Sequence, residues 1–157
     1  MGEMASFFEV CDAARADDVA ALAEAMATHE GEVDAATDRG AGNVLHFACD
    51  AAARRVVEHV LDEAPHLVNR GAAEDGSTPL HRIARHCHVT RTEPDGTTSE
   101  PYLELYAVLL RRGADPTIPD KEHGVLPHDC VVRRCEARPF LQRAGVALTV
   151  PNGKQNR

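Results

Sequence analysis

The chain has few aromatic side chains and no long apolar run. Its 157 residues include no Trp, four Phe and two Tyr, so alanine and the aliphatic side chains must fill most of any core. No apolar stretch approaches the roughly 20 residues that a membrane-spanning helix needs, and no secretory h-region opens the chain. Runs with strand-type alternation are scarce as well. These absences predict one soluble, all-α domain located in the cytoplasm or also in the nucleus.

The cysteines are scattered rather than paired. Their count is odd, and neither a CxxC pair nor a dense disulfide spacing is present. We therefore expect reduced thiols in the core and no metal or other cofactor. The alternative is zinc bound by the local cluster His86-Cys87-His88 together with later ligands, although zinc usually requires four converging ligands at other spacings. The five cysteines are Cys11, Cys49, Cys87, Cys130 and Cys135, and the other candidate ligand is His128.

Two segments repeat the same pattern 35 residues apart. Asn43–Cys49 reads NVLHFAC and Thr78–Ala84 reads TPLHRIA. Each is preceded by a Val-Asp or Val-Asn pair 12 residues before its histidine, and by a glycine suited to a tight turn. After each copy comes a segment with apolar residues at i, i+1, i+4 and i+5, which is one face of a helix. These later segments are 56–61 and 105–110, and the glycines are Gly40 or Gly42, then Gly76.

This pattern resembles the ankyrin repeat, a β-turn and two helices in about 33 residues. The resemblance implies an ankyrin-repeat solenoid of about four helix-turn-helix units with short hairpin loops. A weaker first copy begins near Val10 and lacks a hairpin, as terminal capping repeats often do. A weaker last copy begins near Gly124 and has a second helix at 139–143. The units cover about 5–36, 37–71, 72–117 and 118–145 of a single domain over 1–145, and 146–157 form a polar tail.

The motif also has a physical interpretation of its own. Pro79 fixes a helical φ and has no N–H to leave unpaired, so it suits a first helical turn. Thr78 before it is a good helix cap, and the ring nitrogens of His81 can bond to hairpin backbone. The first copy caps with Asn43 but lacks the proline. The structural motif residues are therefore Asn43, His46, Thr78, Pro79, Leu80 and His81, with Pro127 and, in place of the histidine, Asp129 in the last copy.

The third unit contains an insertion. The stretch from Cys87 to Gly113 is 14 residues longer than the equivalent stretch from Ala52 to Ala64. The extra segment, 89–101, has the turn signal Pro94-Asp95-Gly96 between two Thr-rich arms. It predicts a short hairpin that projects from the edge opposite the ankyrin-type hairpins. Such insertions are often functional, and the alternative is a tolerated loop.

The resemblance also implies where a partner would bind. In ankyrin-repeat proteins the concave surface consists of hairpin tips and the exposed ends of the first helices. Several arginines map there, which predicts an acidic or phosphorylated partner segment, because guanidinium groups bind carboxylate and phosphate in a bidentate manner. The alternative is that these arginines only solubilise helix ends. The implied positions are Arg39, Asp50, Asp75, Arg85, His86, Lys121, His123, Arg133 and Arg134.

The charge is unevenly distributed. The net charge is −8; residues 1–38 carry ten acids and one base, whereas residues 131–157 carry six bases and one acid. An acidic chain is a poor ligand for nucleic acid. The start, Met1–Ser6, formally matches a myristoylation pattern, but the acidic residues that follow disfavour an anionic membrane. We therefore expect a monomer that binds neither nucleic acid nor membrane.

The resemblance implies a non-catalytic protein–protein interaction module that acts as an inhibitor or adaptor. No nucleophile elbow, phosphate-binding glycine loop or carboxylate pair in a cleft-forming fold is evident, so we do not expect an enzyme. Two alternatives stay open. The chain would be a regulatory subunit if its partner is an enzyme, and a zinc or redox sensor if it holds zinc or a low-pKa thiol near Cys87.

Overall fold

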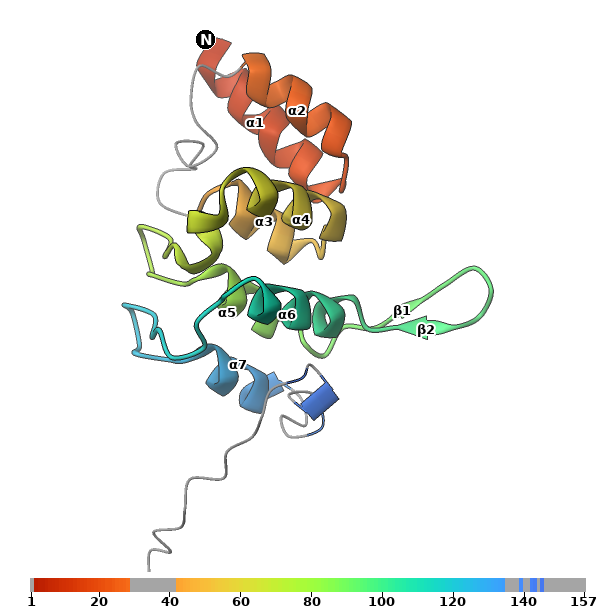
Figure 1. Cartoon of the computed structure of the whole chain (residues 1–157), viewed down its shortest axis with the longest axis vertical. Helices are drawn as coiled ribbons and strands as arrows, with labels where there is room; N and C mark the ends of the chain where they lie inside the picture. The colour runs from red at the N-terminus through yellow and green to blue at the C-terminus, as the bar shows by residue number, and fades with distance from the viewer. Residues whose placement is uncertain (1, 29–41, 135–138, 140–141, 144, 146–157) are drawn as a thin grey trace, which may run out of the picture.

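The computed structural model describes residues 2–28, 42–134, 139, 142, 143 and 145. In these ranges the chain is mostly α-helical, as the sequence predicts, and the one sheet has two short strands. The helices follow one another along the long axis of the molecule (Figure 1). They are α1 (Gly2–Arg15), α2 (Val19–Thr28), α3 (Val44–Asp50), α4 (Arg54–Glu63), the 3-10 helix η1 (Pro65–Asn69), α5 (Pro79–Ala84), α6 (Pro101–Arg111) and α7 (Pro127–Arg134), with strands β1 (Arg91–Thr92) and β2 (Thr98–Ser99) between α5 and α6.

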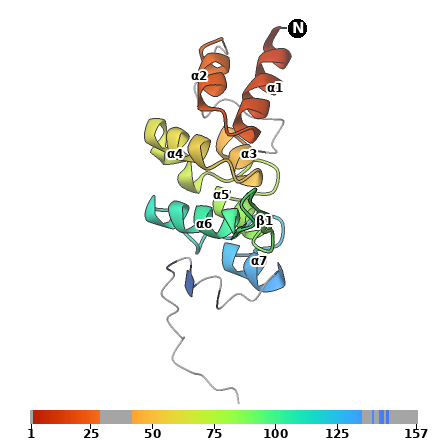
Figure 2. The same cartoon turned by 90° about the vertical axis from the view of Figure 1, so that its right-hand side faces the viewer.

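The helices form two layers. Figure 2 shows α1, α3 and α5 on one side of the molecule and α2, α4 and α6 on the other. Within the first layer, α1 contacts α3, α3 contacts α5, and α5 contacts α7. We call the helix pairs α1/α2, α3/α4 and α5/α6 the first three units, and α7 begins the fourth. The packing of each first helix against the next is therefore the main contact between neighbouring units.

Small and aliphatic side chains fill the core, as the shortage of aromatic residues requires. The predicted apolar face of α4 is confirmed, because Val56, Val57, Val60 and Leu61 are all buried. In α6 the buried face includes Tyr106, which is completely buried. Alanines are also buried in α1 and α3, where their small size allows close approach of backbones.

The turns between paired helices repeat as well. Asp17 and Ala52 both have positive φ, 55° and 52°, and they are 35 residues apart, as His46 and His81 are. Asp17 also joins two units, since its carboxylate accepts hydrogen bonds from the Val56 N–H at 2.9 Å and from Arg55 at 3.2 Å. The third equivalent position is Cys87, and there the chain enters the insertion instead.

The insertion forms the hairpin that its turn signal predicts. Arg91 pairs with Ser99 and Thr92 with Thr98 in antiparallel register. The Asp95 carboxylate accepts from the Thr97 N–H at 2.9 Å. The hairpin projects on the side opposite the α4–α5 and α6–α7 loops (Figure 1). One boundary differs from the expected 89–101: Pro101 is the first residue of α6, because proline is well suited to the first turn of a helix.

Some sequence predictions fall outside the described residues. These are residues 29–41 of the loop before α3, residues 140 and 141 of the second helix expected at 139–143, and the tail 146–157. Within the described ranges, none of the helices combines the length and the hydropathy that a membrane crossing requires.

The loops of the third and fourth units touch at Gly76. The Lys121 N–H donates to the carbonyl of Asp75 at 2.8 Å, and Gly76 has a φ of +69°. A Cβ at Gly76 would lie 2.5 Å from Lys121 Cγ and 2.9 Å from Lys121 N. The equivalent glycine of the fourth unit, Gly124, has a φ of +63°, but a Cβ added there would meet no atom within 4 Å.

We expect Gly76→Ala to destabilise the protein by about 2–4 kcal/mol and Gly124→Ala by about 1 kcal/mol. Both changes place an L-residue at positive φ, and only the first also forces two loops apart. Urea unfolding of the two variants and the parent measures the difference. Equal losses would contradict the close approach at Gly76.

Candidate functional site

The motif residues of three units make the same local bond. In each unit, the side chain at the motif position accepts a hydrogen bond from the backbone N–H of the residue three positions earlier. This acceptor satisfies one of the N–H groups that a helix leaves unpaired at its start. The distances are 3.1 Å from the Asn43 N–H to His46 Nδ1, 3.1 Å from the Thr78 N–H to His81 Nδ1, and 3.1 Å from the Leu126 N–H to Asp129 Oδ2.

The other ring nitrogen of each histidine reaches the next unit. His46 Nε2 lies 2.9 Å from the Ser77 carbonyl, and His81 Nε2 lies 2.7 Å from the Val125 carbonyl. A carbonyl only accepts and a backbone N–H only donates, so a neutral ring with its proton on Nε2 satisfies both partners at once. A carboxylate has no such proton to give. The series of inter-unit bonds from this position therefore ends at Asp129.

Burial opposes charge on these rings. His46 and His81 are both completely inaccessible to solvent. Burial lowers the pKa of His46 to about 4, against the opposing effect of its bond to Ser77. Burial likewise lowers the pKa of His81. Protonation would also place a second N–H against the backbone N–H that Nδ1 accepts.

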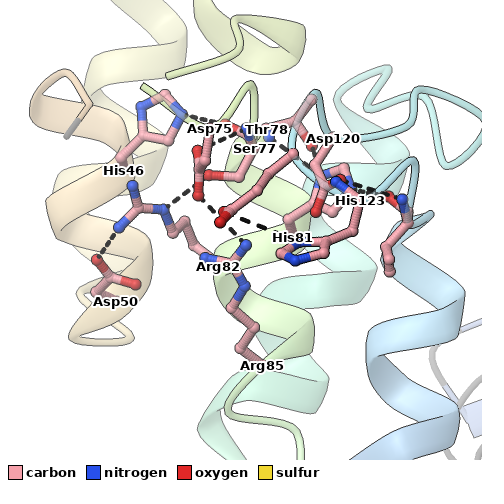
Figure 3. A network of polar contacts seen from close by, with 12 residues as sticks. His46, Asp50, Asp75, Ser77, Thr78, His81, Arg82, Arg85, Asp120 and His123 are labelled. Carbon is pink, nitrogen blue, oxygen red and sulfur yellow. Dashed lines mark hydrogen bonds and ion pairs between the residues drawn. The ribbon is translucent and has the colours of Figure 1, made fainter. Parts of the chain in front are cut away.

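A network of arginines and aspartates lies beside the histidines (Figure 3). Arg82 donates to Asp50 on α3 at 3.0 Å and to the Ser77 hydroxyl at 3.2 Å. Arg85 pairs with Asp75 at 3.4 Å. The network thus joins the ends of α3 and α5 to the loop before α5, and it gives each of these two arginines a carboxylate partner within the chain.

Asp75 is held in its charged form. Partial burial by itself would raise the pKa of its carboxyl group. Hydrogen bonds from Ser77 and the nearby charges of Arg82 and Arg85 outweigh that effect and hold the pKa of Asp75 at about 2. The ion pairs of this face are therefore present at neutral pH.

The loop tips of the third and fourth units lie together. Glu74, Asp75, Lys121 and Glu122 line one shallow depression. Below it, Asp120 is buried and its carboxylate accepts from the N–H groups of His123 and Val125, at 2.9 and 3.1 Å. These two bonds lower the pKa of Asp120 although burial opposes them. The tips are thus fixed by backbone bonds and leave the Lys121 and His123 side chains exposed.

The base of the inserted hairpin is attached to the second unit. The Tyr102 hydroxyl donates to the Asp50 carbonyl at 2.6 Å, and Arg91 donates to the Ala51 carbonyl at 3.4 Å. The His86 ring lies 5.1 Å from the Tyr102 ring, and His86 Nε2 lies 3.7 Å from the Asp50 carboxylate. The hairpin base therefore borders the same helix ends that the sequence assigns to the binding face.

The sequence-derived binding positions are only partly brought together. Asp50, Asp75, Arg85 and His86 lie in or beside one network, and Lys121 and His123 lie in the adjacent loop. Arg39 is outside the described residues, and Arg133 and Arg134 lie in α7 without described side chains. Sequence reasoning missed three residues that hold this face together: Arg82, Tyr102 and Asp120. The one signal for Arg82 was its place next to the motif histidine.

Four of the cysteines are buried, whereas the candidate zinc ligands His86 and His128 are half-buried and His88 is exposed. Cys11, Cys49, Cys87 and Cys130 are buried thiols. Burial raises the pKa of the Cys49 thiol. His128 Nδ1 lies 2.6 Å from the Tyr106 hydroxyl, whose pKa burial raises. Among the residues that the structure describes, no three His, Cys, Asp or Glu side chains are placed to share one metal ion.

Comparison with known proteins adds no relative. No protein-family model matches the chain, and no curated protein matches it.

We expect acid to weaken the fold through His46. The unfolded histidine titrates near 6.5 and the folded one at about 4, so the unfolded state binds more protons between these values and stability falls as pH falls. The free energy of unfolding should drop by about 2 kcal/mol from pH 7 to pH 5 through this residue. Urea unfolding at both values measures it. His46→Gln should lose this part of the slope and His66→Gln, at an exposed position, should keep it; identical slopes would contradict the assignment.

We expect His81→Ala to cost about 3 kcal/mol and Asp129→Ala about 1 kcal/mol. The first change leaves the Thr78 N–H and the Val125 carbonyl without their partner, whereas the second affects a single N–H at an exposed site. Urea unfolding at pH 7.5 compares them. Equal losses would show that the inter-unit bond of His81 contributes nothing.

Proposed function

We propose that the chain is a four-unit ankyrin-type solenoid that binds another protein and catalyses no reaction. One observation carries the proposal: His46 and His81, 35 residues apart, bond through equivalent atoms to equivalent carbonyls of the following unit. A bond of this kind stacks each unit on the next in one orientation. Stacked units place their loops along one edge, which is how repeat proteins build extended binding surfaces.

The proposed binding face consists of the exposed ends of α3, α5 and α7 and the tips of the loops before α5 and α7. Two of its arginines, Arg82 and Arg85, are held by ion pairs to Asp50 and Asp75. The side chains of Arg85 and His86 nevertheless remain partly exposed, at 36% and 39%. A face whose side chains are already ordered loses less entropy when it binds a partner.

The absence of catalysis is part of the proposal. It accords with the finding that no buried side-chain nitrogen or oxygen in the described part of the chain lacks a hydrogen-bond partner. The buried thiols, with the pKa of Cys49 raised, also make a redox sensor less suitable, since reactive cysteines are accessible and have a lowered pKa. The chain would be a regulatory subunit if the protein it binds is an enzyme. Reduced cysteines suit a monomer of the cytoplasm or nucleus.

Affinity capture from lysate tests this face. We expect a partner to be retained by the intact protein and reduced about tenfold by Arg85→Glu combined with Arg133→Glu and Arg134→Glu, since the loss of one charged contact is worth about that much. A control variant carries the same charge reversals at Arg54, Arg111 and Arg112, in the layer of α4 and α6. Arg54 and Arg112 also have ion-pair partners. Circular dichroism verifies folding, and quantitative mass spectrometry measures retention. If no protein distinguishes the two variants, the proposed face is wrong.

A further inference from the structure

The inserted hairpin is an exposed element that the core does not need. Residues 90–98 are all exposed, and the hairpin projects away from the helices (Figure 1). Its strands pair at two positions, Arg91 with Ser99 and Thr92 with Thr98. A two-stranded hairpin of this size has little stability of its own. It can therefore open into an extended segment while the helices stay folded.

The hairpin is acidic and rich in hydroxyl groups. Residues 89–100 contain three acids and one base. The base, Arg91, donates to the Ala51 carbonyl at the foot of the hairpin, and hydrogen bonds from Thr97 lower the pKa of Asp95 and hold it charged. A protein that receives this segment therefore needs a positively charged cleft. The five residues with hydroxyl groups are Thr90, Thr92, Thr97, Thr98 and Ser99.

The structure distinguishes among these hydroxyl groups. The Thr97 hydroxyl donates to the Asp95 carboxylate at 2.6 Å, and the Ser99 hydroxyl donates to the Glu93 carboxylate at 2.8 Å. Both are thus already held inside the hairpin. Thr92 lies on β1, is exposed and takes no part in these two bonds.

The residues that follow Thr92 also set it apart. The chain continues Glu93-Pro94-Asp95, which places carboxylates one and three positions after the hydroxyl. In an extended segment these two side chains lie on the same side, opposite to Thr92. One basic cluster can then bind both carboxylates while the hydroxyl points the other way. Thr90 is followed by an arginine, and Thr98 has no acid one or three positions later.

We propose that Thr92 is a phosphorylation site for an acidophilic serine/threonine kinase, one whose substrate cleft is basic. Its hydroxyl oxygen attacks the γ-phosphorus of ATP, and the bond from that phosphorus to the oxygen shared with the β-phosphate breaks. ADP leaves, and the hydroxyl proton passes to a carboxylate of the kinase. Glu93 and Asp95 pair with the basic side chains of the cleft. The product carries about two more negative charges on the hairpin.

This inference does not depend on the proposed function. Thr92 lies outside the helix ends and loop tips of the proposed binding face, and its modification needs ATP and a kinase but no other partner. The phosphate would nevertheless add charge to an element whose base borders that face.

Kinase assays on the full chain test the proposal. With ATP and an acidophilic kinase, we expect one phosphoryl group on Thr92, located by tandem mass spectrometry. Thr92→Ala should abolish the transfer and Thr92→Ser should retain it. Glu93→Gln combined with Asp95→Asn should lower kcat/KM at least about tenfold, the value of one charge-assisted contact, and asparagine suits the same turn. The control, Glu74→Gln with Glu122→Gln at the loop tips, should stay within about twofold.

Other outcomes overturn the inference. Circular dichroism first verifies that each variant is folded. Phosphate located on Thr97, on Ser99 or outside the hairpin would overturn it, and so would the absence of any transfer. A rate that the Glu93 and Asp95 changes leave unaltered, or equal transfer by a kinase that prefers basic substrates, would show that the carboxylates do not direct the reaction. The capture experiment with the arginine variants tests the proposed function separately.

Discussion

The bond from each motif histidine to a carbonyl of the next unit holds the rest of the structure in register. Helices of six to eight residues, such as α3, α5 and α7, have little stability of their own. A neutral imidazole solves two problems at once, because it accepts a backbone N–H at the start of its own helix and donates to the backbone of the following loop. Complete burial keeps the ring neutral, and neutrality is what permits both bonds.

The binding face is a consequence of that register. When His46 fixes Ser77 relative to α3, it also brings Arg82 to Asp50, and when His81 fixes Val125 it places the loop of Asp120 beside that of Asp75. Arg82 and Arg85 consequently form ion pairs inside the molecule and also remain partly exposed. The inserted hairpin leaves the fold where the other two units make a tight turn at positive φ, so its base borders the same face without disturbing the stack.

Much of this arrangement could be predicted from the sequence, because it depends on local patterns. The period of 35 residues, the apolar faces of α4 and α6 and the Pro94-Asp95-Gly96 turn each need only a short stretch of chain. The pairing of Asp50 with Arg82 depends on how one unit is rotated against the next, which no local pattern records. Ala52 at positive φ gave no signal either, since glycine or asparagine is the usual residue there. Tyr102 lies between the expected insertion and the apolar segment 105–110, where no pattern marked it, yet its hydroxyl bonds to the Asp50 carbonyl of another unit.

The tautomers of His46 and His81 test the central claim most directly. In ¹⁵N-labelled protein at pH 7, two-bond nitrogen–proton correlations show which ring nitrogen carries the proton. Both rings should be neutral with the proton on Nε2, and the pKa of His46 should be about 4 while that of His81 lies below the ordinary histidine value. A proton on Nδ1, or titration near the ordinary histidine value, would show that these rings do not join one unit to the next.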